Sequence, residues 1–252
     1  MVARMLRYMV RVPMLLMHLV IGLPLALLLI ASPLSRLRMG DESFEHWLIR
    51  AWSAGMLRVF GFRTRRIGTP VTGAAMFVAN HVSWIDIQAL HSQRMMGFVA
   101  KREIQDWPLI GWMAVRAETI FHHRGSTESL GGVLHEMLAR LRGGRSVGVF
   151  PEGGARGGGE LGPFHARIFM AAVDAGVPVQ PVALRYGENG SAQRTVAFAR
   201  GEGFLGNFQR LLGEPPRVAE VHFLTPIQPN EADGRRRIAE LARRRIVEAM
   251  AS

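Results

Sequence analysis

The sequence predicts an α/β protein, with a mostly parallel central sheet flanked by helices and preceded by an N-terminal pair of membrane-associated helices. After residue 60, short apolar segments typical of strands alternate with segments of helical periodicity, the pattern of parallel strands joined by crossover helices. Before it, residues 12–31 carry no charged side chain and would form a helix of about 30 Å, enough to cross a bilayer core. We therefore divide the chain into a membrane-anchoring helical segment, residues 1–60, and a globular domain, residues 61–252.

The apolar segment has basic residues on both sides, so charge predicts no orientation across a membrane. The flanking arginines are Arg4, Arg7, Arg11, Arg36 and Arg38. Pro24 is expected to kink a helix here. Residues 43–60 have apolar side chains at helical spacing, and Trp47 and Trp52 suit the headgroup level of a bilayer. This segment is predicted to be the second membrane-associated helix, with an ordinary core helix as the alternative.

The globular domain contains strand and helix patterns in turn. Strands are predicted at residues 62–67, 75–78, 97–100, 119–121, 146–150, 178–183, 195–198 and 219–224. Helices are predicted at residues 83–90, 104–115, 129–141, 163–175 and 231–250. Gly176 is placed to end the fourth of these helices.

The composition narrows the functional classes. The 252 residues include no cysteine, which excludes disulfides, cysteine-ligated metals and a cysteine nucleophile, and favours a reducing compartment. Lys and Arg outnumber Asp and Glu 31 to 20, for a net charge of +11, so an anionic partner is expected. An arginine-rich nucleic-acid-binding protein would satisfy that charge, but no nucleic-acid-binding module can be found in the sequence, and we expect no nucleic-acid partner.

Three phosphate or nucleophile motifs are discarded. Lys101 is the one lysine, and it follows Ala100, so no Walker A loop exists. Ser146 lies in a G-x-S-x-G sequence, but a predicted helix precedes it and a strand follows, which is the reverse of a nucleophile elbow. The G-x-G-x-x-G at residues 157–162 begins well after the preceding strand and lacks the downstream acidic residue of a dinucleotide site.

His81 and Asp86 form the strongest catalytic candidate. They lie in the sequence NHVSWID, residues 80–86, which follows a predicted strand and opens a helix. Helical side chains lean towards the N-terminus, so Asp86 can point back at the imidazole. A carboxylate on one ring nitrogen leaves the other free as a general base. The alternative is structural, because Ser83 and Asp86 also have the spacing of a capping box. A non-catalytic membrane scaffold would have no use for His81.

Three later segments complete a recognisable set. They are TIFHHR at residues 119–124, FPEG at residues 150–153 and VPVQPVA at residues 177–183. Together with residues 80–86 they resemble, in order and spacing, the four blocks of the glycerolipid acyltransferase family, whose bacterial type member is 1-acyl-sn-glycerol-3-phosphate acyltransferase. The resemblance spans roughly residues 75–186. One block alone is weak evidence, whereas four in order are specific.

The resemblance implies a function for the globular domain. It implies that residues 61–252 are an acyltransferase domain, which moves a fatty acyl group from a thioester to the hydroxyl of lysophosphatidic acid and produces phosphatidic acid. A thioester is already activated, so no covalent nucleophile is needed, which agrees with the absence of cysteine. His81 is then the expected base and Asp86 its orienting partner.

The other blocks imply binding residues. Arg124, at the end of the second block, is expected to bind the acceptor phosphate through its fork of donors, and Lys101 is a weaker phosphate candidate. Glu152, followed by Gly153, is expected to accept hydrogen bonds from a glycerol hydroxyl or from Arg124. Its place after a strand is where α/β sheets position ligands.

Two features leave alternatives open. Pro181 and Val182 in the fourth block are expected either to form the wall of an acyl site or to be core strand. The third block usually continues Glu-Gly-Thr-Arg, whereas here a threonine is missing and Arg156 lies one place later. Arg156 is therefore a weaker phosphate ligand, and another lyso-lipid such as lyso-ornithine lipid remains an alternative acceptor.

The expected partners follow from this chemistry. They are membrane lipids, a lysophospholipid acceptor, and acyl-CoA or acyl-carrier protein as co-substrate, with no bound cofactor. No metal is expected, because the histidines lack ligand spacing. The basic helix predicted at residues 231–250 is either a solvated surface or a contact for anionic lipid or an acidic carrier protein. The expected location is the inner membrane, with the active site on the cytoplasmic side.

Overall fold

The central sheet is mixed but mostly parallel, as the sequence predicts. The computed structural model describes residues 1–252 except 41, 109, 123–126, 156, 232–233 and 252. Within this part of the chain the sheet has seven strands in the order β3-β9-β8-β4-β7-β5-β6. Only β8 and β9 pair antiparallel among them. The strands are β3 (Phe62–Ile67), β4 (Met76–Ala79), β5 (Gly97–Lys101), β6 (Ile120–His122), β7 (Val147–Val149), β8 (Val179–Tyr186) and β9 (Arg217–Phe223).

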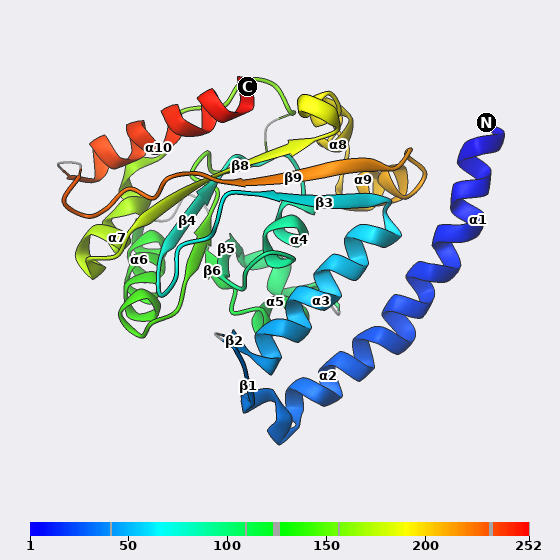
Figure 1. Ribbon diagram of the computed structural model, residues 1–252, viewed down its shortest axis with the longest axis horizontal. Coiled ribbons are helices and arrows are strands. Elements are labelled where there is room, and N and C mark those ends of the chain that lie inside the picture. The colour runs from blue at the N-terminus through cyan, green and yellow to red at the C-terminus, as the bar shows by residue number, and fades with distance from the viewer. Residues whose placement is uncertain (41, 109, 123–126, 156, 232–233, 252) are drawn as a thin grey trace.

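Helices cover both faces of the sheet (Figure 1). The helices of the globular domain are α4 (Ile85–His91), α5 (Ile110–Arg116), α6 (Thr127–Arg142), α7 (Met170–Ala175), α8 (Gln193–Val196), α9 (Phe204–Leu212) and α10 (Gly234–Ala251). Short 3₁₀ turns precede α5 at Arg102–Asp106 and α7 at Ala166–Phe169. Gly176 ends α7 in the left-handed conformation, as expected from the sequence.

Strand β4 divides the core in two. Successive side chains of a strand point to opposite faces of the sheet. Phe77 and Ala79 accordingly pack with α3 (Phe44–Val59), α4 and α9. Met76 and Val78 pack on the other side with α6, α7 and α10. Because β4 is buried on both faces, its carboxyl end is held firmly, and this end leads directly into residues 80–86.

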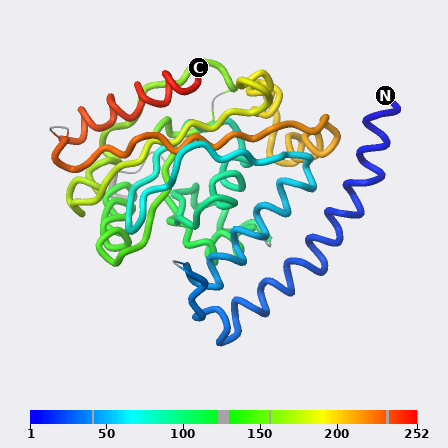
Figure 2. The backbone as a smooth tube through the Cα atoms, viewed as in Figure 1, coloured from blue at the N-terminus to red at the C-terminus, as the bar shows by residue number. Residues whose placement is uncertain are grey.

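The N-terminal segment forms two long helical arms that fold back on each other. Helix α1 (Val2–Met17) continues through a π-helical turn, His18–Gly22, into α2 (Leu23–Ala31). Helix α3 then returns beside α2, as Figures 1 and 2 show. Pro24 does not break the helix. The wider π turn immediately before it accommodates the missing N–H and the bulk of the proline ring.

The sequence-based elements differ from the structure in four places. The helix predicted at residues 163–175 is a 3₁₀ turn, Ala166–Phe169, followed by the short helix α7. The strand predicted at residues 195–198 is wrong, because residues 193–196 form α8. Helix α9 was not predicted. The helix predicted at residues 104–115 is divided at Trp107 and Pro108, since the residue before a proline avoids helical geometry.

In the part of the chain that the structure describes, one helical stretch, Val2–Ala31, is long and apolar enough to cross a membrane by length and composition. Its mean hydropathy reaches 2.5, and most of it is not buried against the rest of the protein. This suggests membrane association.

Candidate active site

His81 and Asp86 meet at the carboxyl end of β4, in the segment we call the catalytic turn, residues 80–86. The Nδ1 atom of His81 lies 2.7 Å from Oδ2 of Asp86. A carboxylate only accepts, so Nδ1 carries the proton and Nε2 keeps its lone pair. Among the described residues Nε2 has no hydrogen-bond partner, and the side chain is 18% exposed. The arrangement can therefore accept a proton from a substrate hydroxyl.

Asp86 is fully buried yet well supplied with donors. Besides His81, its Oδ2 accepts the backbone N–H groups of Val82 (2.5 Å) and Ser83 (2.9 Å). Its Oδ1 accepts the hydroxyl of Tyr186 at 2.5 Å. Asp86 thus contacts the imidazole and also tightens the turn before α4. The capping box is only half formed, because the Ser83 hydroxyl accepts the N–H of Ile85 and not that of Asp86. Four donors stabilise a carboxylate that burial alone would destabilise.

Tyr186 is a functional candidate that the sequence analysis missed. It ends strand β8, is 1% exposed and lies a hundred positions from Asp86. Burial, together with the charge and hydrogen bond of Asp86, raises the pKa of Tyr186 well above its ordinary value, so the hydroxyl remains a donor. Nothing in local spacing could have linked these two residues, because the sheet brings them together.

Asn80 and Glu152 hold the backbone on either side of His81. The Asn80 amide exchanges two hydrogen bonds with the backbone of Leu184 in β8, at 3.0 and 2.8 Å. Glu152 follows β7, the parallel neighbour of β4, and its Oε1 accepts the His81 N–H at 3.1 Å. Its Oε2 accepts the N–H of Gly162 at 2.9 Å. Glu152 therefore positions His81, and its contact with a substrate hydroxyl stays a prediction.

Aromatic packing fixes the plane of the imidazole. The ring of His81 stacks on Phe150, with centroids 4.1 Å apart and an angle of 15° between planes. Phe150 in turn stacks on Phe98 of β5 at 5.4 Å. The plane of the base is therefore set by two neighbouring strands.

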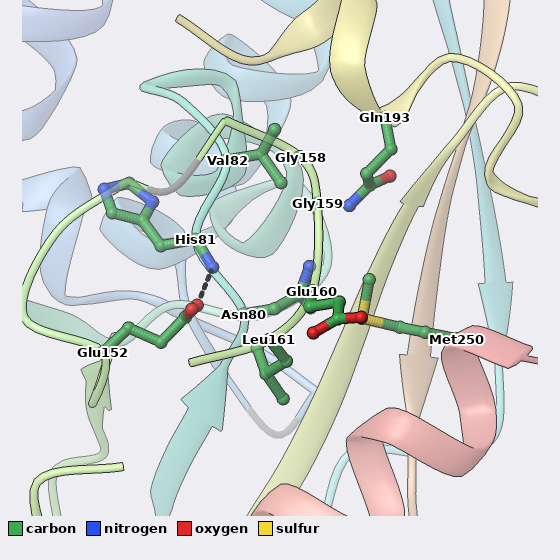
Figure 3. Close-up of a pocket in the computed structure, with 10 residues that line it drawn as sticks. All are labelled: Asn80, His81, Val82, Glu152, Gly158, Gly159, Glu160, Leu161, Gln193 and Met250. Atoms are coloured by element: carbon green, nitrogen blue, oxygen red, sulfur yellow. Dashed lines mark hydrogen bonds between the residues drawn. The ribbon is translucent and has the colours of Figure 1, made fainter. Parts of the chain in front are cut away.

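A small hollow adjoins the catalytic turn, with an enclosed volume of about 10 Å³. That is about the space of one water molecule, so this hollow does not enclose a substrate. Figure 3 shows Gln193 and Met250 on the side opposite Glu152, with the imidazole projecting away from them. The lining residues are Asn80, His81, Val82, Glu152, Gly158, Gly159, Glu160, Leu161, Gln193 and Met250.

The hollow is partly built by the C-terminal helix. Arg243 of α10 donates to the carbonyl oxygens of Leu161 (2.6 Å) and Gly162 (2.8 Å). Gly162 also bonds Glu152, so α10 braces the glycine-rich loop that touches the catalytic turn. In the sequence Arg243 was one of several arginines on an amphipathic helix and carried no distinguishing signal.

The remaining predicted site residues lie in different parts of the structure. Lys101 is exposed at the end of β5, and Gly153 forms a turn with φ +77°. Pro181 and Val182 are buried in β8, Val182 within the main core, so the core-strand alternative describes their position and the acyl-wall role stays a prediction. Arg124 and Arg156 lie outside the described residues, and their roles also remain predictions.

No group of three or more His, Asp and Glu side chains that could hold a metal ion occurs in the described part of the chain. The buried His91 instead donates from its ring to the Met96 backbone oxygen at 2.9 Å. Since a carbonyl only accepts, Nε2 of His91 carries the proton.

Comparisons with known proteins place the chain in a family and match its fold. A sequence model of the family described as Acyltransferase matches residues 63–185. The chain is 36% identical over 197 residues to a lyso-ornithine lipid O-acyltransferase of Pseudomonas aeruginosa, covering 78% of this chain and 74% of the relative. It is 40% identical over 111 residues to a 1-acyl-sn-glycerol-3-phosphate acyltransferase of Neisseria gonorrhoeae, covering 44% of each.

The crystal structure of a 1-acyl-sn-glycerophosphate acyltransferase from Thermotoga maritima has the same fold. It superposes with a TM-score of 0.71 over 97% of this chain and 96% of that one, at 19% identity. The fold and the family match define an acyltransferase. This chain belongs to the acyltransferase family of the lysophospholipid type.

Proposed function

We propose that this chain transfers a fatty acyl group from acyl-CoA or acyl-carrier protein to the hydroxyl of lyso-ornithine lipid at a membrane surface. The choice of acceptor rests on how much of this chain each relative matches. The match to the P. aeruginosa relative named for this acceptor covers 78% of the chain, whereas the match to the gonococcal relative named for the phosphate-bearing acceptor covers 44%. Lysophosphatidic acid is the second candidate, supported by the four sequence blocks.

The His81 and Asp86 pair supports a direct transfer. The acceptor hydroxyl loses its proton to Nε2 of His81 as its oxygen bonds to the thioester carbonyl carbon. The carbon–sulfur bond then breaks, and the proton passes from His81 to the departing thiolate. Asp86 keeps the imidazole in the correct tautomer and stabilises its positive charge. Such a positioned base contributes about 10²–10⁴ in rate.

The outer face of the N-terminal helix supports membrane location. Apart from Arg4 near its start, its exposed side chains are apolar, whereas Arg7 and Arg11 face the protein. Exposed apolar residues include Met5, Leu6, Met9, Val10, Leu16, Met17, Val20, Ile21, Leu25 and Leu28. A helix with one polar face towards the protein and an apolar outer face suits burial in one leaflet. The inner membrane, with the active site facing the cytoplasm, is the location we propose.

An acceptor panel tests the proposal. Purified enzyme in mixed micelles is assayed with lyso-ornithine lipid and lysophosphatidic acid, each with acyl-CoA and with acyl-carrier protein. We expect kcat/KM to be at least tenfold higher for lyso-ornithine lipid. A kcat/KM that is tenfold higher for lysophosphatidic acid would make that lipid the assigned acceptor. Activity with neither acceptor would overturn the proposal. His81→Ala is the matched inactive control in each reaction.

A further inference from the structure

The polar side chains of α1 face the globular domain and bind the end of α9. They donate to backbone oxygens in the last turn of α9 and just beyond it. The hydrogen bonds are Arg7 Nε to Gly213 (2.7 Å), Tyr8 Oη to Gln209 (2.8 Å), and Arg11 Nη1 to Leu212 (2.9 Å) and Glu214 (2.7 Å). The last carbonyls of a helix have no partner within the helix. Helix α1 supplies those partners from about two hundred positions away.

The Arg11 guanidinium lies in a narrow space between Gly61 and the end of α9, which we call the seat of Arg11. Arg11 is 6% exposed, although its helix is otherwise largely exposed. A Cβ atom at Gly61 would overlap the Arg11 guanidinium, and one at Gly213 would lie 2.7 Å from the Tyr8 hydroxyl. Two glycines therefore leave the space that the side chains of α1 fill. A guanidinium buried in this seat is not available to lipid headgroups, the role that its place beside an apolar segment would otherwise indicate.

Helix α9 in turn binds the catalytic turn. Asn207, fully buried in the middle of α9, accepts the indole N–H of Trp84 at 3.1 Å. Its amide nitrogen donates to the backbone oxygens of Val196 and Ala197, which fixes its orientation. Phe208, the next residue of α9, stacks on Trp84 with centroids 5.2 Å apart.

Trp84 lies between the two residues of the proposed catalytic pair. It directly precedes α4 and adjoins Ser83, whose N–H is bonded by Asp86. A shift of α9 therefore moves Trp84, and with it the backbone donors that orient the Asp86 carboxylate towards His81. Small displacements of such groups have large effects on rate because proton transfer requires close alignment.

We propose that α1 acts through Arg11 as a positioning element for the catalytic turn, and that the connection runs through α9 and Trp84. This rests on the proposed role of His81 as base. The N-terminal helix then has two separate faces: an apolar outer face that contacts lipid, and an inner face that positions the catalytic turn.

Arg11→Met tests the proposal, because methionine fills the seat without donating. We expect kcat to fall about tenfold, with the KM of the acyl donor within twofold and membrane association unchanged. Arg11→Lys, which keeps a donor, should recover part of the loss. Arg36→Met is the matched control, since Arg36 flanks the same apolar segment but is exposed. Parental kcat in Arg11→Met, or an equal loss in Arg36→Met, would overturn the proposal.

A double-mutant cycle tests the route. Trp84→Phe removes the hydrogen bond to Asn207 and keeps an aromatic ring. If the effect passes through Trp84, adding Arg11→Met to Trp84→Phe lowers kcat little further. A kcat equal to the product of the two single effects would disprove the route.

A milder variant keeps the proposal testable should Arg11→Met not fold. Tyr8→Phe loses one hydroxyl donor only, and we expect kcat to fall about threefold. Parental kcat in that variant would count against α1. These outcomes are independent of the proposed base: full activity in His81→Ala would refute the proposed mechanism itself, whatever Arg11 does.

Discussion

The catalytic turn, residues 80–86, and helix α1 both satisfy backbone groups with polar side chains, but over very different distances along the chain. Asp86 binds the N–H groups of Val82 and Ser83, its immediate neighbours. Arg11 binds the carbonyls of Leu212 and Glu214, some two hundred positions away. The first arrangement is visible as a sequence motif, whereas the second is visible only after folding.

This difference explains why the His81–Asp86 contact could be predicted from spacing, whereas the contacts of Arg11 could not. In the catalytic turn, chain geometry nearly forces His81 and Asp86 together, so spacing carries the information. In α1, composition correctly indicated an apolar helix with basic flanks. It assigned no contact to the arginines, however, because nothing local reveals that Arg11 has acceptors elsewhere in the protein.

The largest expected effect belongs to the catalytic turn. His81→Ala removes the group that can take the hydroxyl proton, so kcat should fall by about 10²–10⁴. Its thermal midpoint and membrane fraction should match the parent protein. His135→Ala is the control, since His135 is exposed on α6 and should keep parental kcat. Turnover within tenfold of the parent for His81→Ala would contradict the mechanism.

Substitutions on the outer face of the N-terminal helix should weaken membrane binding and leave kcat unchanged. Leu16→Glu with Val20→Glu places two charges on side chains that are 55% and 68% exposed. Since a charge in the apolar part of a bilayer costs at least about 2 kcal/mol, vesicle binding should weaken tenfold or more. The kcat in detergent should stay parental.

The control for this variant is Val173→Glu on α7, an exposed apolar site away from α1. Undiminished flotation of the double variant with liposomes would show that the outer face does not contact lipid.

A smaller effect is expected at Tyr186, which supports the turn over a long distance. Tyr186→Phe leaves Oδ1 of Asp86 without its hydroxyl donor, so negative charge increases on the carboxylate and favours the imidazolium. We expect kcat to fall about tenfold and the acidic limb of the kcat/KM profile to move to higher pH. If kcat falls but the acidic limb of the kcat/KM profile stays at the pH of the parent enzyme, Tyr186 has only a packing role.

The smallest effect at neutral pH concerns His91, at the end of α4. Burial lowers its pKa from 6.5 to about 4. As pH falls below about 6.5 the unfolded chain binds this proton while the folded protein does not, so the unfolding free energy decreases towards pH 4. The contribution reaches about 3 kcal/mol and is absent above pH 7.

His91→Gln can keep an N–H for the Met96 oxygen but does not titrate. Its unfolding free energy should therefore vary less between pH 6.5 and 4 than that of the parent, as measured by denaturant titration at each pH. Parallel curves for the two proteins would assign the acid sensitivity to other groups.

Much of the site's framework could be predicted because parallel strands end at one edge of a sheet. Residues 80–86 and 150–153 each follow a predicted strand, which indicated that both lie at the ligand-binding edge of the sheet. That the two strands, β4 and β7, are neighbours and bring Glu152 to His81 came from the structure. The detail of that contact was not predictable, because it depends on which oxygen of Glu152 faces the His81 backbone. Helices α8 and α9 escaped prediction, since α8 is short and the strand-like residues around Thr195 pack as a helix against β8 instead.

By itself the sequence determined the α/β class, the apolar N-terminal helix and the His81–Asp86 pair, because hydrophobic periodicity and short-range spacing act within a few residues. Only the tertiary structure decided that Tyr186 completes the donors of Asp86, that Arg243 braces the loop beside Glu152, and that Arg11 is buried against α9. Each of these contacts joins groups from distant parts of the chain. Their distances are set by how the helices pack on the sheet, and a side chain carries no local sign of the partner that such packing brings to it.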